Sequence, residues 1–194
     1  KKAGIYYSLE GYLYPETYYF EDKNVSVKTI FEKMLSETNK VLLTLKKDIE
    51  KKDMTVHEII TLSSVVELEG IYIKDRKEIA GVFYNRLNNN WSLESDVTTY
   101  YAVKKDMGAY PVLYQSDIEY ISPYNTRLQS MAGKIPIGPI SNPSKSSIEA
   151  VLYPVETNNF FFVADCTTGK TVFNKTYANH VVSVNKIKAS GCKF

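Results

Sequence analysis

Residues 55–70, TVHEIITLSSVVELEG, constrain the fold most, because they predict a core helix that carries a carboxylate on its apolar face. Thr55 and Glu58 stand at capping-box spacing, which fixes the start of the helix. At about 100° per residue, Glu67 falls inside the apolar arc, whereas Glu69 points almost the opposite way. An ionised carboxylate that faces a core is costly unless it is paired.

Two interpretations of Glu67 follow from this position. In the first, Glu67 is a buried structural carboxylate bonded to an Arg, a Lys or a backbone N–H. In the second, it is a general acid whose pKa is raised by burial, so that it holds a proton near neutral pH. The periodicity of the helix does not choose between them.

Composition describes an ordinary globular domain. The 194 residues suffice for one domain, and 44% hydrophobic with 24% charged residues is typical of such a protein. The net charge is only +2, with Lys and Arg spread along the chain. This argues against nucleic acid as the main partner.

The sequence contains no apolar run near the ~18 residues that a membrane span requires. Because the chain begins at Lys1 without a Met, we expect an excised part of a longer protein, with any anchor upstream. Cys166 and Cys192 could form one disulfide, but they are neither a disulfide framework nor a metal site. With only two histidines and no ligand spacing, a structural zinc site is not expected.

Local signals predict several helices and one hairpin. A short strand, a turn and a second extended piece are expected over residues 5–20, and a long ordered loop over residues 122–143. Residues 159–176 are typical of a β-hairpin that turns near Gly169. Helices are expected after Ser26, over residues 55–70, from Asp75 to Asn88, from Val97, from Ser144 and after Thr176. Asp75 and Glu78 are expected to form a cap pair at the start of their helix. The expected class is α+β, a single domain of several helices packed with a small, mainly antiparallel sheet and a long loop lining a cleft.

Six segments in order, covering almost the whole chain, resemble the YceG-like (MltG) family of endolytic murein transglycosylases. They are LEGYLYPETYYF, SSVVELEG, EIAGVFYNRL, LESDVTTYY, SPYNTRL with IGPISNPS, and FFFVADCTTGKTVFNKTYANH. The resemblance implies that residues 1–194 are the catalytic domain of a membrane-anchored bacterial enzyme acting outside the cytoplasm. The anchor and a LysM-like region of such proteins would lie upstream of this chain.

The activity implied is endolytic cleavage of the bond between N-acetylmuramic acid and N-acetylglucosamine in nascent peptidoglycan strands, leaving 1,6-anhydro ends and terminating elongation. Peptidoglycan synthases and divisome or elongasome proteins are the further partners implied. The sugar's own 6-hydroxyl is the nucleophile in such a reaction, so one carboxyl group serves first as acid and then as base. Neither a metal nor an organic cofactor is called for.

The resemblance places the catalytic acid at the first Glu of the SxVExE helix, which is Glu67 here. It also suggests substrate-binding residues around the cleft. These are Glu16, Asn85, Ser95, Asp96, Thr98, Tyr124, Asn125 and Thr126. For each of these residues the competing interpretation is structural, as a helix cap, a partner in a turn hydrogen bond or a packing residue.

The chain departs from the family pattern at LESDVT, where the family usually carries LQSDPT. Glu94 thus replaces a Gln and Val97 a Pro. Because of this extra acid next to the cleft, a muramidase-type hydrolase remains an alternative function, with Glu94 or Asp96 as its second carboxylate. A non-catalytic glycan-binding module of the wall-synthesis machinery, with the 16 tyrosines as sugar platforms, is a third possibility.

Overall fold

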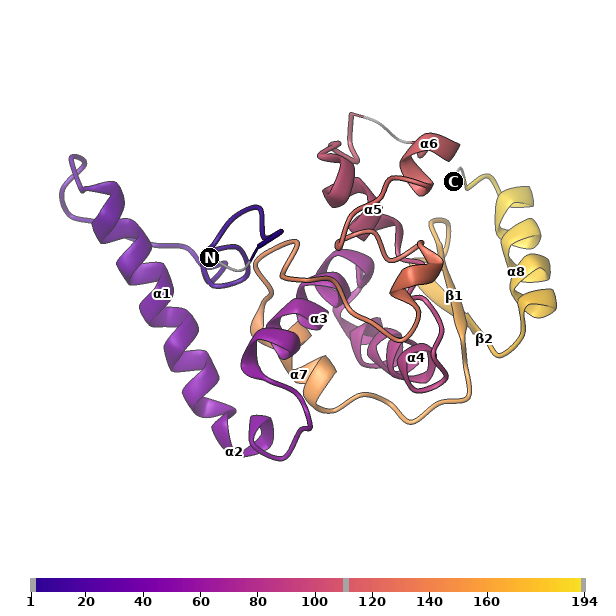
Figure 1. Cartoon of the computed structure of the whole chain (residues 1–194), viewed down its shortest axis with the longest axis horizontal. Helices are drawn as coiled ribbons and strands as arrows, with labels where there is room; N and C mark the ends of the chain where they lie inside the picture. The colour runs from indigo at the N-terminus through magenta and orange to yellow at the C-terminus, as the bar shows by residue number, and fades with distance from the viewer. Residues whose placement is uncertain (1–2, 110–111, 193–194) are drawn as a thin grey trace.

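The computed structural model describes residues 3–109 and 112–192, which form an α+β domain built around two central helices. Figure 1 shows α3 and α4 at the centre, with α1 projecting on one side and α8 at the opposite end. The helices are α1 (Val27–Thr44), α2 (Lys46–Ile49), α3 (Val56–Glu69), α4 (Arg76–Asn88), α5 (Asp96–Val103), α6 (Gln115–Ile118), α7 (Lys145–Leu152) and α8 (Tyr177–Ala189), with 3-10 turns η1 (Ile73–Asp75) and η2 (Gln129–Met131).

The helix α3 is the centre of the core. Its residues 59–66 are fully buried, and it packs against α4, α5 and α7. The capping box is made as predicted: Thr55 accepts from the Glu58 N–H, and the Glu58 carboxylate accepts from the Thr55 N–H. The long loop follows α3 on one side, where the Ile140 N–H donates to the Ser64 hydroxyl at 3.0 Å.

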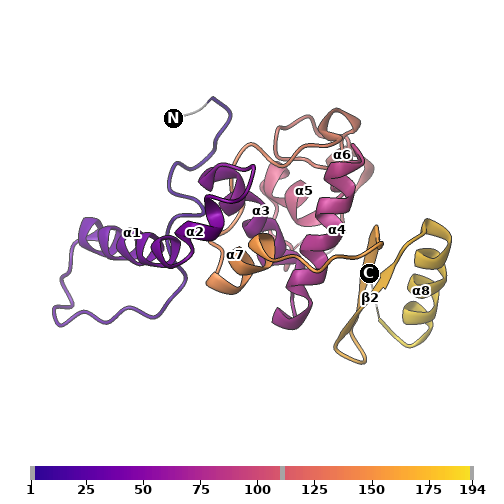
Figure 2. The ribbon, with the colours of Figure 1, turned by 90° about the horizontal axis from the view of Figure 1, so that it is seen from below.

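The sheet is a two-stranded antiparallel hairpin of β1 (Phe161–Asp165) and β2 (Lys170–Asn174). Val163 pairs with Val172 at its centre, and Gly169 takes a left-handed φ of 64° in the turn, as the TG signal predicts. A disulfide joins Cys166, just after β1, to Cys192, just after α8. In Figure 2 the hairpin lies between the helical body and α8.

Two local expectations are wrong. Residues 5–20 contain no strand; their backbone is held by side chains from elsewhere, such as Asn142, whose Oδ1 accepts from the Gly11 and Leu13 N–H groups. Asp75 at the N-cap of α4 and Glu78 in its first turn form no side-chain cap. Their carboxylates accept instead from Thr171 and Asn159, so tertiary contacts replace the local bonds.

The other expected elements are present. The helices begin close to their predicted caps; Ser26 and Thr176 accept from the N–H groups of Thr29 and Asn179. Among the described residues, no helix combines the length and the apolar character needed to cross a bilayer.

Candidate active site

A cleft of about 550 Å³ opens where the helical body meets the hairpin and α8, and Glu69 lies in it. Glu69 is the last residue of α3, so the helix at the centre of the core carries this side chain to the cleft. The lining combines charged, polar, aromatic and aliphatic side chains. It comprises Glu69, Phe83, Arg86, Trp91, Leu93, Glu94, Ser95, Asp96, Arg127, Phe161, Phe162, Val163, Tyr177, His180, Val184 and Lys188.

Ser95 orients the Glu69 carboxyl group. Its hydroxyl donates to Glu69 Oε1 at 2.6 Å and makes no capping bond to α5, although it occupies the N-cap position. Two threonines hold the Ser95 backbone: its N–H donates to Thr126 Oγ1 at 3.2 Å, and its carbonyl accepts from Thr98 Oγ1 at 2.7 Å. The two threonine hydroxyls also contact each other at 2.7 Å. Thr98 and Thr126 are fully buried, and their hydrogen bonds thus fix the backbone of Ser95.

Burial raises the pKa of Glu69, and the nearby negative charge of Asp96 adds to the rise. The hydrogen bond from Ser95 and the positive charges of Arg127 and Arg86 act in the opposite direction, but they do not offset burial. A larger fraction of Glu69 is therefore protonated near neutral pH than for an exposed glutamate. This is the property that a general acid needs.

The other two carboxylates of the cleft are each paired with an arginine. Asp96 Oδ1 accepts from Arg127 Nε at 2.6 Å, and Glu94 lies 3.5 Å from Arg86. Arg86 is itself buried and fixed by the carbonyl groups of Leu93 and Phe160. Among the described residues, Glu69 has no ion-pair partner, which distinguishes it from Glu94 and Asp96.

Aromatic side chains form a further part of the cleft lining. Phe161 contacts Trp91, Tyr177 and His180, with ring centroids 6.1, 5.8 and 5.4 Å away. Trp91 and Tyr177 are 45% and 67% exposed, so their ring faces are available to a ligand. Exposed aromatic faces beside polar groups are well suited to sugar rings.

Glu67 does not line this cleft. Its Oε1 lies 2.8 Å from Arg76 Nη2, and its Oε2 accepts from the Ser144 N–H at 2.8 Å and the Ser144 hydroxyl at 2.6 Å. Burial alone would raise the pKa of Glu67, but the two Ser144 bonds and the charge of Arg76 outweigh it and lower that pKa. The expectation of a raised pKa at Glu67 is therefore wrong, and the group has the contacts of a structural carboxylate joining α3, α4 and α7.

The remaining residues suggested by the resemblance lie outside the cleft. Tyr124 and Asn125 are buried; the Asn125 amide donates to the carbonyl groups of Ile118 and Tyr120 and shapes the loop. Asn85 donates to the carbonyl groups of Thr157 and Asn159 on another face of α4. Glu16 is exposed in the N-terminal segment.

Several cleft residues escaped the sequence analysis, namely Glu69, Arg86, Trp91, Arg127, Tyr177 and His180. The direction of Glu69 on the helix suggested solvent, and only the packing of α5 and the hairpin shows that a cleft lies there. The one signal that the sequence offered for Trp91 is that it is the single tryptophan of the chain. Within the described part of the chain, no three His, Cys, Asp or Glu side chains gather as a metal site.

Fold and cleft together define the class: an α+β domain whose arginine-lined, aromatic cleft holds a desolvated carboxyl group that has no ion-pair partner within the described part of the chain. The YceG-like family model matches residues 1–186, and the chain belongs to this family.

Named relatives agree with this membership. The endolytic murein transglycosylase of Bacillus subtilis (strain 168) is 41% identical over 176 residues, and that of Streptococcus pneumoniae (strain D39) is 37% identical over 183 residues. The alignments cover 91% and 93% of this chain but 47% and 32% of those relatives, so the chain spans half of their length or less. The crystal structure of a yceG-like protein from Listeria monocytogenes matches 93% of the chain and 57% of that protein, with a TM-score of 0.85 and 39% identity.

Proposed function

We propose that this domain is the catalytic part of an endolytic peptidoglycan lytic transglycosylase, and that Glu69 is its general acid and base. The observation that carries the proposal is a desolvated carboxyl group, oriented by Ser95, inside a cleft with exposed aromatic rings. The names of the relatives from Bacillus and Streptococcus support the substrate and the reaction class. Membrane attachment through a segment outside this chain, action outside the cytoplasm, and wall-synthesis partners belong to the same proposal.

In this mechanism the Glu69 proton goes to the oxygen that bridges N-acetylmuramic acid and N-acetylglucosamine, and the bond to the anomeric carbon breaks. The Glu69 carboxylate then takes the proton of the 6-hydroxyl, whose oxygen bonds to the anomeric carbon and closes the anhydro ring. The intramolecular nucleophile avoids the cost of ordering a water. Ser95 keeps the carboxyl group in place for both proton transfers.

We transfer the catalytic role from Glu67 to Glu69 for two reasons. Glu67 holds a salt bridge and two further hydrogen bonds that stabilise its ionised form, so its proton is absent near neutral pH. Glu69 has the opposite pKa shift and lies in the cleft. Ser95 and Asp96 keep their proposed place at the substrate, and Thr98 and Thr126 act as positioning residues.

The test of the reaction class is mass spectrometry of products from uncrosslinked glycan strands digested in ¹⁸O-labelled water. The proposal expects 1,6-anhydro ends without label. The presence of Glu94 and Asp96 in the cleft specifically favours the competing muramidase, which would give reducing ends that carry the label. If the wild-type protein binds glycan strands but does not cut them, the domain is a glycan-binding module instead.

A further inference from the structure

The helix α8 supplies one wall of the cleft. Tyr177, His180, Val184 and Lys188 line it, and their spacing of three and four residues places them on one face of the helix. Glu69 and Ser95 come from the helical body instead. The width of the cleft therefore depends on where α8 lies relative to that body.

The contacts that hold α8 are few. It packs on β1 and β2, where buried Val163, Ile187 and Cys192 form a small cluster separate from the main core. The partly buried Val172 and Val184 complete this cluster. Units with small cores open more readily than the main core of a domain, so α8 needs another constraint to keep a fixed position.

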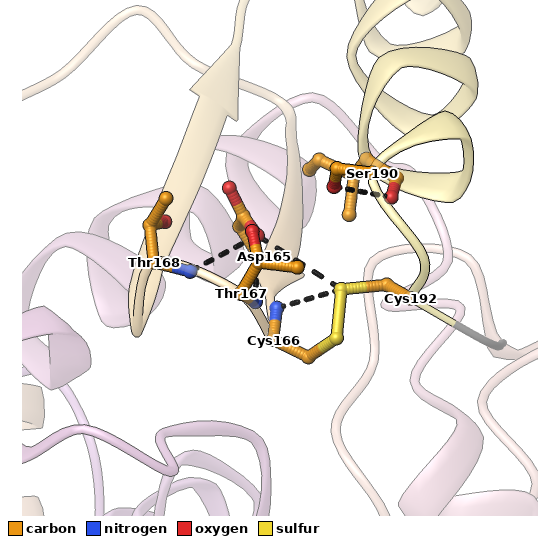
Figure 3. Close-up of a disulfide and its surroundings, with 7 residues drawn as sticks. Asp165, Cys166, Thr167, Thr168, Ser190 and Cys192 are labelled. Atoms are coloured by element: carbon orange, nitrogen blue, oxygen red, sulfur yellow. Dashed lines mark hydrogen bonds between the residues drawn. A yellow bond between two sulfur atoms is a disulfide. The ribbon is translucent and has the colours of Figure 1, made fainter.

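The disulfide supplies that constraint at the C-terminal end of α8. Cys192 follows the helix and is joined to Cys166, with a Cα–Cα distance of 5.8 Å across 26 positions of sequence. Figure 3 shows the bond between the hairpin turn and the chain that leaves α8. The Cys166 N–H also donates to Cys192 Sγ at 3.0 Å.

The hairpin side of this link is itself well fixed. Asp165 Oδ1 accepts from the N–H groups of Thr167 at 2.9 Å and Thr168 at 3.3 Å, and from the Thr167 hydroxyl at 2.7 Å. These bonds, led by that of the Thr167 hydroxyl, lower the pKa of Asp165 to about 2, so the carboxylate stays ionised and keeps the turn ordered. The disulfide thus ties α8 to a rigid point.

We infer that the Cys166–Cys192 disulfide is a positioning element of the substrate site: it holds α8 as the cleft wall, and its loss weakens glycan binding without changing the chemical step. The inference rests on the proposed function.

The disulfide can be reduced in the folded protein. Cys166 is exposed, so a small dithiol can reach the bond. A dithiol thiolate attacks one sulfur and releases the other as a thiolate; the second thiol of the reductant then displaces the first cysteine, which leaves two cysteine thiols and an oxidised, cyclic reductant.

The test compares steady-state cleavage of soluble, uncrosslinked glycan strands by oxidised and dithiothreitol-reduced wild-type protein. We expect reduction to raise KM several-fold while kcat stays within about twofold, because Glu69 and Ser95 lie outside the tethered unit. The C166S/C192S double variant should show the same KM in both conditions, equal to that of the reduced wild type. Circular dichroism of each sample verifies that the helical body is intact.

An unchanged KM on reduction, or a fall confined to kcat, would overturn the inference; so would mass spectrometry that finds two free thiols in the untreated protein. If the double variant fails to fold, the wild-type comparison alone decides. If neither form cleaves glycan, the proposed function fails, and binding of fluorescent glycan strands to oxidised and reduced protein still tests the disulfide. Equal affinities in that assay would contradict it.

Discussion

Two glutamates two positions apart on α3 have opposite electrostatic surroundings. Glu67 is paired with Arg76 and bonded to Ser144, whereas Glu69 is desolvated beside Ser95. The pKa of Glu67 is lowered and that of Glu69 is raised. This difference supports the proposed structural role of Glu67 and the proposed chemical role of Glu69, and it makes the two roles separable by experiment.

The two Gln variants should differ in stability, and Glu67→Gln should be the less stable one. Because the folded pKa of Glu67 lies below its unfolded value, its contribution is present above the unfolded pKa and is lost as pH falls through the folded one. Glu67→Gln should therefore lower the free energy of unfolding at pH 7 by about 1–3 kcal/mol, since buried Arg76 loses its charged partner. Urea unfolding at pH 7 and again at low pH measures this loss, which should shrink in acid.

Glu69→Gln is the matched variant. A raised folded pKa means that the ionised carboxylate destabilises the fold, and that the penalty grows as pH rises from the unfolded pKa through the folded one. The variant should consequently match or exceed the wild type in unfolding free energy at pH 7, while Gln keeps an acceptor for Ser95. A loss as large as that of Glu67→Gln would mean that Glu69 is a structural carboxylate too.

Ser95→Ala tests the orientation of Glu69. The Ser95 hydroxyl stabilises the ionised form of Glu69, so its removal should raise the pKa of Glu69 further. A general acid must be protonated, so activity declines as pH rises through that pKa. In the variant, the alkaline limb of the kcat/KM profile should move to higher pH while the maximal rate falls. If the alkaline limb does not move, Ser95 has no effect on the pKa of the group whose titration produces that limb.

At the level of elements, α4 packs closely against the loop that leads from α7 to β1. Gly81 allows this approach: a Cβ at this position would lie 2.3 Å from the Val155 carbonyl oxygen. Gly81→Ala should therefore destabilise the domain by about 1–3 kcal/mol, because backbone must move to admit the methyl group. Gly108→Ala, where the nearest atom is the Asp106 carboxylate oxygen at 3.1 Å, is the control in thermal unfolding.

The elements also show what sequence can predict. The starts of α1, α3 and α8 depend on caps within a few residues, so local spacing identified them. The strand expected in residues 5–20 failed, because its aromatic residues pack as turns held by distant partners such as Asn142. The proposal of Glu69 in place of Glu67 was out of reach of the sequence for the same reason. It depends on Arg76, Ser144 and Ser95, which reach α3 only in the folded chain.

At the scale of the whole molecule, the cleft lies between two parts of unequal packing. The main core surrounds α3 and includes hairpin residues such as Phe162 at its edge, whereas α8 packs on the hairpin through a small separate cluster. Hydrogen exchange should accordingly be slowest in α3 and faster in α8, and reduction of the disulfide should accelerate exchange in α8 alone. Hydrogen exchange followed by mass spectrometry of peptides from both helices measures these rates. Equal protection of α3 and α8 after reduction would contradict the claim that the disulfide holds α8 in place.

The most direct test of the central claim compares glycan cleavage by Glu69→Gln and Glu67→Gln on the same uncrosslinked strands at neutral pH. If Glu69 is the proton donor, its variant should lose about 10²–10⁴-fold in rate, the range attributed to general acid–base catalysis, while folded Glu67→Gln protein retains most of its activity. The reverse order, with Glu69→Gln active and folded Glu67→Gln inactive, would contradict the assignment.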